Sequence, residues 1–561
     1  MPSPIRPLIA PALPALNSAR RHELANPRNK SWLRLGRIAV ACCLLLAGLG
    51  AAQVQTPAPA PRAGNSLPSL GDGLELAAAT ERRLGDRIAA SIYRDPDYLD
   101  DPVLGDYLQG IWLPLLAAAR VRGELAAELE ERFAWEVLQV RDRSVNAFAL
   151  PGGYLGVHTG LVGVVANADE LAAVLAHELS HVTQRHISRL MTQQQRQMPW
   201  VIGAMILGVL AASKSPTAAN AAIVGGQAVA QQGQLNFSRD MEREADRVGF
   251  GVMTDAGFEG SGVSGMFEKL QHAARLNDNG SFPYLRSHPL TTERIAEARA
   301  RLQLASSQAG AQAPTAANRA AAHLHAMMSA RARVLGSPGS DALQNMLAEA
   351  QRALQAASGS ELTPAVSGAL YGGAFAASRL REHVAAHTLA ARLRAGIAGT
   401  TRARSMANLL TIEVDLEAGN AAQAAEASRL SGGGSRAELL VQARALLAVG
   451  RAAEVSEALQ TWVVAHPKDA LAWQLLSEAW TRQGQTSRAI RADAESRAAQ
   501  LDYPAALDRL KAAQEVLRRG SESAGRNNHI ESSIIDSRTR QVTALIREQA
   551  LEDKVDRKLQ H

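Results

Sequence analysis

The sequence predicts a mainly α protein, with one small sheet in its N-terminal half and an all-α array of helix pairs in its C-terminal half. Aromatic residues make up only 4% of the 561 residues and alanine is abundant, which favours closely packed helices. Apolar residues recur at three- and four-residue steps through most of the chain. In the C-terminal half, Gly419, Gly450 and Gly484 recur at spacings of 31 and 34 residues, which indicates a repeat.

Residues 1–52 have the pattern of a signal peptide for export to the periplasm. Seven basic residues and one acid precede the uncharged run 38–52, which is too short to span a bilayer. An uncleaved anchor is the alternative. Both cysteines lie in this run, so the cleaved protein would contain no thiol, which suits an oxidising compartment. Residues 53–73 are rich in Pro, Gly and Ser and are expected to be a linker.

The net charge of +6 comes entirely from the predicted signal peptide. The rest of the chain carries equal numbers of basic and acidic residues. It therefore has no overall basic field for a polyanion, and we expect no nucleic-acid partner.

Residues 74–304 are expected to form the first domain. A helical pattern is followed by "RFAWEVLQVRD" and "VNAFALPGGYLGVHTGL", which predict a strand and a hairpin. A helix capped by Asn167 or Asp169 comes next. The apolar run 201–212 is too short to span a membrane. We expect it to be a buried helix, with a helix that contacts the membrane surface or covers the cleft as the alternative.

The composition changes at residues 305–318, which predicts a linker to a second domain at 319–520. Trp473, Leu476 and Trp480 precede Gly484 at the positions that aromatic and leucine residues occupy in the 34-residue tetratricopeptide repeat. An unrelated helical bundle is the alternative. Residues 521–561 predict a charged C-terminal helix that covers the end of the array or extends from it.

The stretch "HELSH" indicates a metal site on the helix that follows the hairpin. His177 and His181 are four residues apart, so both imidazoles lie on one face and can bind one zinc ion per chain. Glu178 lies beside that face, where it can act as general base on a water activated by the ion. His186 is nine positions from His177 and is expected to face solvent on the opposite side.

The third ligand has to come from another element. The metzincin extension is excluded, because Gln184 and Ile187 stand where it needs Gly and His. The segment "EREAD" offers Glu242 as ligand and Asp246, four residues later, as acceptor for a ligand imidazole. The alternative for this segment is a solvated, ion-paired surface helix.

Three stretches together, "HELSH", "SRDMEREADRVG" and "RSHPLTTERI", resemble the HtpX/CAAX-prenyl-protease family of zinc metallopeptidases. The resemblance implies a zincin-like α+β metallopeptidase domain with a small sheet, followed here by a tetratricopeptide-repeat solenoid. It assigns zinc to His177, His181 and Glu242, and catalysis to Glu178.

The same resemblance gives roles to residues outside the ligand set. Asp246 would orient a ligand histidine. His288 would stabilise the oxyanion, or bind zinc and hold the resting enzyme closed. A further stretch, "VNAFALPGGYLGVHTGL", resembles the family's strand before the catalytic helix. It would provide an edge strand for substrate, with the contact residues Asn146, Ala147, Phe148 and Ala149.

With an export signal and a repeat array, the chain resembles the periplasmic members of that family that act as protease and chaperone in outer-membrane protein assembly. The expected function is a periplasmic zinc endopeptidase that cleaves misfolded or unassembled envelope proteins, while the repeats dock substrate or the outer-membrane assembly machinery. A chaperone or scaffold with minor or conditional proteolysis is the alternative from another class, and a zinc-free relative with an intact fold is a third.

Overall fold

The computed structural model describes residues 77–194, 239–275, 284–306, 316–336, 338–356, 362–397, 402–429, 434–519 and 526–559. The predicted signal peptide and linker and the apolar run 201–212 lie outside the described residues. Within the described ranges, none of the helices has the length and apolar character that crossing a membrane requires.

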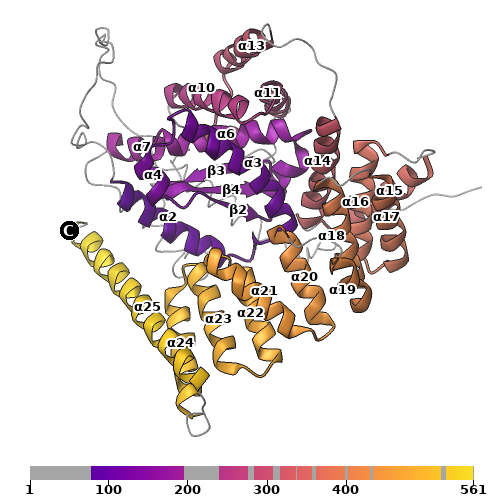
Figure 1. Cartoon of the computed structure of the whole chain (residues 1–561). Helices are drawn as coiled ribbons and strands as arrows, with labels where there is room; N and C mark the ends of the chain where they lie inside the picture. The colour runs from indigo at the N-terminus through magenta and orange to yellow at the C-terminus, as the bar shows by residue number, and fades with distance from the viewer. Residues whose placement is uncertain are drawn as a thin grey trace, which may run out of the picture.

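The N-terminal part consists of helices around one small sheet, as predicted (Figure 1). In chain order its elements are α2 (Ala78–Tyr93), β1 (Tyr98–Leu99), α3 (Pro102–Val121), α4 (Ala127–Arg132), β2 (Glu136–Val140), β3 (Ala147–Leu150), a 3₁₀ turn (Pro151–Gly153), β4 (Tyr154–His158), α5 (Thr159–Val164), α6 (Ala168–Thr183), α7 (His186–Gln194), α10 (Arg239–Asp255), α11 (Ser261–Arg275), α12 (Tyr284–Ser287) and α13 (Thr292–Ser306).

The four strands lie in the order β1-β2-β4-β3, with β2 and β4 parallel and the other pairs antiparallel. Alternate side chains face opposite layers. Leu138 and Phe148 pack with Leu84 and Ile88 of α2, whereas the opposite face joins the core formed with α3 and α6. Consequently β3 is an edge strand whose inner face meets α6.

The predicted hairpin is the β3–β4 pair, joined by the turn Pro151–Gly153. Gly152 and Gly153 have φ values of +74° and +83°. Only glycine adopts this region readily, so the "PGG" sequence determines where β3 ends and β4 begins.

The C-terminal part is entirely helical in the described residues, also as predicted (Figure 1). Its elements are α14 (Ala316–Leu335), α15 (Ser340–Ala356), α16 (Pro364–Arg379), α17 (His383–Gly396), α18 (Arg402–Glu417), α19 (Ala421–Arg429), α20 (Arg436–Ala448), α21 (Ala452–Ala465), α22 (Ala470–Arg482), α23 (Thr486–Ala499), α24 (Tyr503–Arg519) and α25 (Arg526–Leu559).

The repeated glycines mark the turns between paired helices. Gly419, Gly450 and Gly484 follow α18, α20 and α22 and have φ values of +81°, +78° and +71°. Each occupies the left-handed position that commonly ends a helix. The 31- and 34-residue spacings therefore correspond to successive helix–turn–helix units, which is compatible with the predicted repeats.

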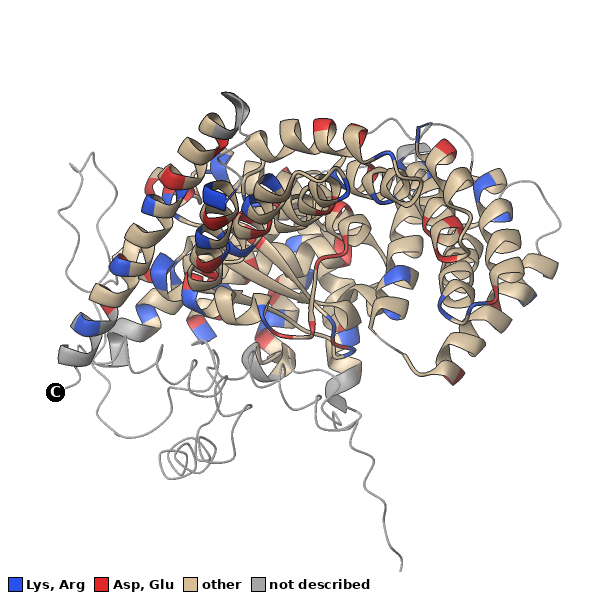
Figure 2. Ribbon diagram, turned by 90° about the horizontal axis from the view of Figure 1, so that it is seen from below, with Lys and Arg blue, Asp and Glu red and all other residues tan. Residues whose placement is uncertain are grey.

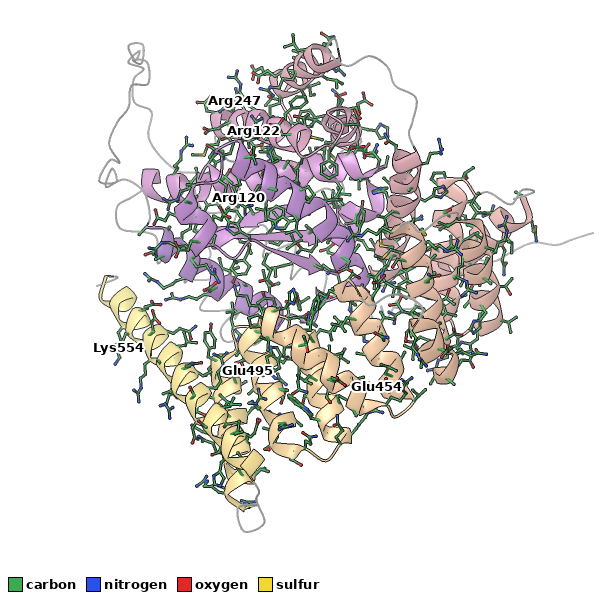
Figure 3. All side chains as sticks on the ribbon, viewed as in Figure 1. Arg120, Arg122, Arg247, Glu454, Glu495 and Lys554 are labelled. Atoms are coloured by element: carbon green, nitrogen blue, oxygen red, sulfur yellow. The ribbon has the colours of Figure 1, made fainter. Side chains whose placement is uncertain are left out.

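The last helix covers the end of the array rather than extending from it. Ile535 and Val542 of α25 are buried against α24. Arg538 of α25 pairs at 2.9 Å with Glu495 of α23, which is labelled in Figure 3. Farther along, Glu552 pairs with Arg83 of α2 at 3.2 Å, so α25 connects the end of the array to the N-terminal part.

Figure 2 shows positions of basic and acidic residues interspersed along the described helices on the side in view. This distribution agrees with the neutral balance of the chain beyond its first 52 residues.

The predicted boundary at 305–318 is not a break in packing. One core cluster continues from α3, α5 and α6 into α14, α16, α18 and α20. Arg331 of α14, only 1% exposed, binds Asp101 at 2.6 Å and Glu413 at 2.7 Å. Its guanidinium thus joins the N-cap of α3 to α18.

Arg331→Ala is expected to destabilise the protein by about 3–5 kcal/mol, because it leaves two carboxylates without their buried partner. Thermal unfolding followed by circular dichroism measures the effect. Arg333→Ala, an exposed position on the same helix, is the matched control. Equal midpoints for the two variants would contradict a stabilising role for the Arg331 contacts.

Candidate metal centre

Helix α6 places the "HELSH" residues in the core. Its N-cap is Asn167, one of the two residues that the sequence offered for this position. The Asn167 side chain accepts a hydrogen bond from the backbone N–H of Glu170. Its apolar residues pack against the sheet and α3, and His177, Glu178 and His181 are 6%, 0% and 0% exposed. Three ionisable side chains buried together require partners, and these come from other helices.

Helix α10 crosses α6 at close range and supplies the carboxylates. Gly249 allows this approach, since a Cβ there would lie 3.1 Å from the backbone of Ala176 and His177. Ala245, fully buried, lies one turn earlier. Small residues at these positions let Glu242 and Asp246 reach the histidines from the same face of α10.

We expect Gly249→Val to weaken zinc binding, because its side chain would force α10 away from α6 and displace Glu242. The loss should be comparable to the roughly 10–100-fold caused by removing a hydrogen-bond partner of a ligand. Gly251→Val is the matched control on the same helix, since the atoms nearest to a Cβ there belong to the flexible guanidinium of Arg122 rather than to backbone. Equal zinc affinities of the two variants, measured by chelator competition, would refute the packing argument.

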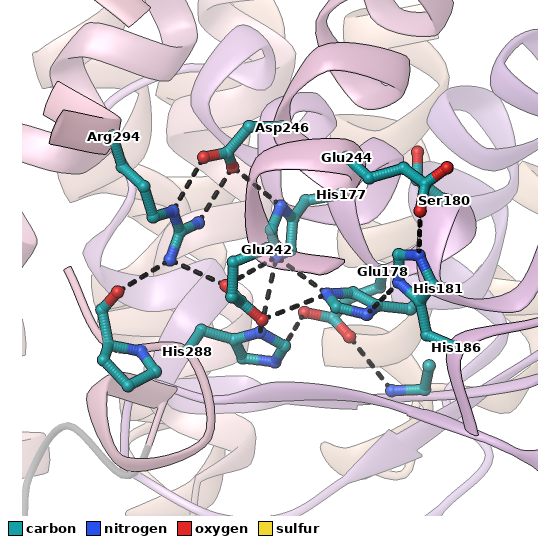
Figure 4. Close-up of polar contacts among 12 residues, drawn as sticks. His177, Glu178, Ser180, His181, His186, Glu242, Glu244, Asp246, His288 and Arg294 are labelled. Atoms are coloured by element: carbon teal, nitrogen blue, oxygen red, sulfur yellow. Dashed lines mark hydrogen bonds and ion pairs between the residues drawn. The ribbon is translucent and has the colours of Figure 1, made fainter. Parts of the chain in front are cut away.

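Four donor side chains converge on one point between α6, α10 and the segment after α12 (Figure 4). The Nε2 atoms of His177 and His181 are 3.0 Å apart, and Glu242 oxygens lie 3.5 Å and 3.4 Å from them. His288 Nδ1 lies 3.3 Å from His177 Nε2 and 2.9 Å from Glu242 Oε1.

These separations fit a zinc ion. A tetrahedron with metal–ligand bonds of about 2.0–2.1 Å has edges of about 3.3 Å. The donor set of imidazole nitrogens and a carboxylate is one that zinc prefers. His177, His181 and Glu242 would hold the ion, and the fourth corner is where the structure places His288.

Asp246 lies where the sequence predicted an acceptor for a ligand histidine. Its Oδ1 is 3.0 Å from His177 Nδ1. Arg294 binds Asp246 through two nitrogens at 2.7 Å and 2.8 Å and also reaches Glu242 at 2.7 Å. Burial opposes ionisation of Asp246, but Arg294 and His177 outweigh it and lower its pKa to about 2. Asp246 is therefore an anionic acceptor.

Glu178 is held between the edge strand and His288. Its Oε2 accepts a hydrogen bond from the backbone N–H of Ala149 at 3.1 Å, and its Oε1 is 3.3 Å from His288 Nε2. Burial raises the pKa of Glu178, although His288 and His177 partly offset it. A carboxylate with a raised pKa is suited to accept a proton near neutral pH.

His186 does not face solvent, so this expectation was wrong. Helix α6 ends at Thr183, and Arg185 has a φ of +53°, which turns the chain back. The ring of His186 is completely buried, with Nδ1 2.9 Å from His181 Nδ1 and Nε2 3.0 Å from Glu244 Oε2. The error came from extending the regular helix three residues beyond its end, to His186.

Comparison with known proteins agrees with this geometry. Residues 118–302 match the model of peptidase family M48. The beta-barrel assembly-enhancing protease of Yersinia pestis is 30% identical over 460 residues, which are 81% of this chain and 88% of the relative. The chain belongs to peptidase family M48. Within that family it is similar to beta-barrel assembly-enhancing proteases.

Other relatives match a smaller part of the chain. The beta-barrel assembly-enhancing protease of Escherichia coli is 32% identical over 239 residues, which are 42% of this chain and 47% of the relative. That alignment spans about half the length of the relative. The mitochondrial metalloendopeptidase OMA1 of Arabidopsis thaliana is 31% identical over 190 residues, 34% of this chain and 35% of that relative.

The structure also brings into the M48 site residues that the sequence reasoning had not assigned. Arg294 lies six residues after His288, within the quoted "RSHPLTTERI", so that stretch could have indicated it. Tyr284 stacks on His288 with ring centroids 4.6 Å apart. Glu244 lies between the two predicted carboxylates of α10, but its contact with His186 depends on the turn at Arg185.

Proposed function

We propose that the chain is a zinc-dependent endopeptidase of the bacterial periplasm that acts on misfolded or unassembled outer-membrane proteins. The observation that carries this proposal is the convergence of His177, His181 and Glu242 at zinc-ligand separations beside the buried carboxylate of Glu178. The names of the bacterial relatives support the choice of substrate class. The predicted signal peptide supports the compartment.

Each side chain of the site has a separate role in the proposed reaction. When bound, a zinc ion would lower the pKa of a water molecule and polarise the scissile carbonyl. Glu178 takes the proton of the attacking water and delivers it to the leaving amine. Asp246 accepts the Nδ1 proton of His177, which leaves Nε2 free for the metal. Arg294 fixes both carboxylates of α10.

The edge strand β3 can pair with an extended peptide. The carbonyl of Asn146 accepts a hydrogen bond from the backbone N–H of His158, so the backbone N–H and C=O groups of Ala147 and Ala149 point away from β4. The hydrogen bond from Ala149 to Glu178 places this edge beside the proposed base. We propose that substrate pairs along Asn146, Ala147, Phe148 and Ala149 as an added strand.

His288 has two roles that its position supports. Its Nδ1 lies 3.3 Å from His177 Nε2 in the donor set, which supports a role as a ligand that holds the resting enzyme closed. With a substrate at the fourth corner of the donor set, the imidazole would instead stabilise the oxyanion of the tetrahedral intermediate. Both roles require the segment 284–288 to present His288 to the metal.

A chaperone or scaffold is the second candidate, favoured by the helical array that follows the M48 match. Such arrays present extended binding surfaces, and we propose that this one docks substrate or the outer-membrane assembly machinery. The apolar run 201–212, expected to be a buried helix or, as the alternative, one that contacts the membrane surface or covers the cleft, lies outside the described residues.

Incubation of the purified chain with a denatured β-barrel protein tests the proposal. We expect discrete fragments, no cleavage in the presence of a zinc chelator, and recovery when zinc is restored. Suppression of aggregation without fragments, unaffected by the chelator, would favour the chaperone instead.

A further inference from the structure

The two ligand histidines of α6 are each connected to a carboxylate of α10, but by different routes. His177 Nδ1 reaches Asp246 directly at 3.0 Å. His181 Nδ1 instead lies 2.9 Å from Nδ1 of His186, whose Nε2 lies 3.0 Å from Glu244. His186 thus occupies, for His181, the position that Asp246 occupies for His177 (Figure 4).

The direction of this second chain of hydrogen bonds follows from the metal. An imidazole that binds zinc through Nε2 carries its proton on Nδ1. His181 Nδ1–H therefore donates, and His186 Nδ1 has to accept. A neutral His186 then carries its proton on Nε2, directed at the carboxylate of Glu244. Arg189 donates to the same Glu244 oxygen at 2.8 Å.

The opposite direction of donation leaves mismatched groups at both ends of this series of hydrogen bonds. If His186 donated from Nδ1, the neutral His181 ring would carry its proton on Nε2, toward the metal. The lone pair of His186 Nε2 would then face the carboxylate of Glu244. Only one direction gives every hydrogen bond in the chain one donor and one acceptor.

Because these side chains are buried, water cannot easily replace the hydrogen bonds between them. His186 and His181 are both 0% exposed. A variant that removes the acceptor would take this hydrogen bond away from the buried N–H of His181, which is costly.

We propose that His186 is a positioning residue of the zinc site, which accepts the Nδ1 proton of His181 and is itself oriented by Glu244. This inference rests on the proposed zinc function. It predicts that zinc affinity depends on the hydrogen-bonding atoms of residue 186 and not on its volume alone.

Zinc affinities of the full-length protein and three variants, measured by competition with a chromogenic chelator, test the inference. His186→Asn keeps an acceptor near the position of Nδ1, His186→Gln keeps a polar group near that of Nε2, and His186→Phe keeps only the ring. We expect roughly 10–100-fold weaker binding for the Gln and Phe variants and a much smaller loss for Asn. The absorption spectrum of the cobalt-substituted protein should shift in the same order.

His325→Phe is the matched control. His325 is similarly buried and also bonded through both ring nitrogens, to Tyr107 at 2.6 Å and to Val165 at 2.9 Å, but it is absent from the donor set. This control should bind zinc like the wild type. Equal affinities for the three His186 variants, or wild-type affinity for the Phe variant, would overturn the inference alone. Absence of zinc binding by the wild-type chain would overturn the proposed function as well.

Discussion

Glu178→Gln is expected to abolish cleavage while the protein keeps its zinc. Glutamine retains an oxygen that can accept the hydrogen bond from Ala149, so the contact between β3 and α6 is kept. It cannot take a proton from the attacking water. Since general acid–base catalysis contributes about 10²–10⁴-fold, the cleavage rate of a denatured test protein should fall by that amount.

Two measurements make the Glu178 result specific. Zinc content by elemental analysis should match that of the wild type, because Glu178 is not assigned as a ligand. Glu268→Gln, the same change at an exposed position of α11, should cleave normally. A Glu178→Gln protein that still cleaves at the wild-type rate would show that another group is the base.

Glu242→Gln should have the second large effect, this time on the metal itself. The substitution removes the carboxylate that lies 3.4–3.5 Å from both histidine Nε2 atoms. His288 and Arg294 would also lose the anion whose pKa they hold well below its ordinary value, against the effect of burial. We expect zinc binding to weaken by more than the 10–100-fold typical of an outer partner, and cleavage to be lost with it.

The Glu242 prediction separates a ligand from a structural carboxylate. Glu268→Gln again serves as the exposed control, and circular dichroism should show that the variant keeps its helices. If Glu242→Gln bound zinc as tightly as the wild type, the third ligand would have to be His288 or Asp246.

Much of the site could be predicted because helix periodicity relates spacing to geometry. His177 and His181, and likewise Glu242 and Asp246, are four residues apart and so share a face. The "PGG" turn and the alternating residues around it indicated the hairpin. The periodic glycines indicated the helix–turn–helix units, since each occupies a left-handed turn position.

The rest depends on contacts between segments distant in sequence. Nothing in "HVTQRH" signals that α6 stops at Thr183, because the left-handed residue there is Arg185 rather than glycine or asparagine. His186 was therefore placed on the wrong side of the helix. The contacts of Arg331 could not be predicted either, because its partners Asp101 and Glu413 are 230 and 82 residues away in the sequence.

The most direct test of the account is the metal content of the purified protein. We predict about one zinc ion per chain, removed by a strong chelator together with proteolytic activity and restored with it on adding zinc. A protein purified without chelators that contains no zinc and binds none when supplied, yet is folded, would contradict the central claim. So would proteolysis by the chain that persists after the metal has been removed.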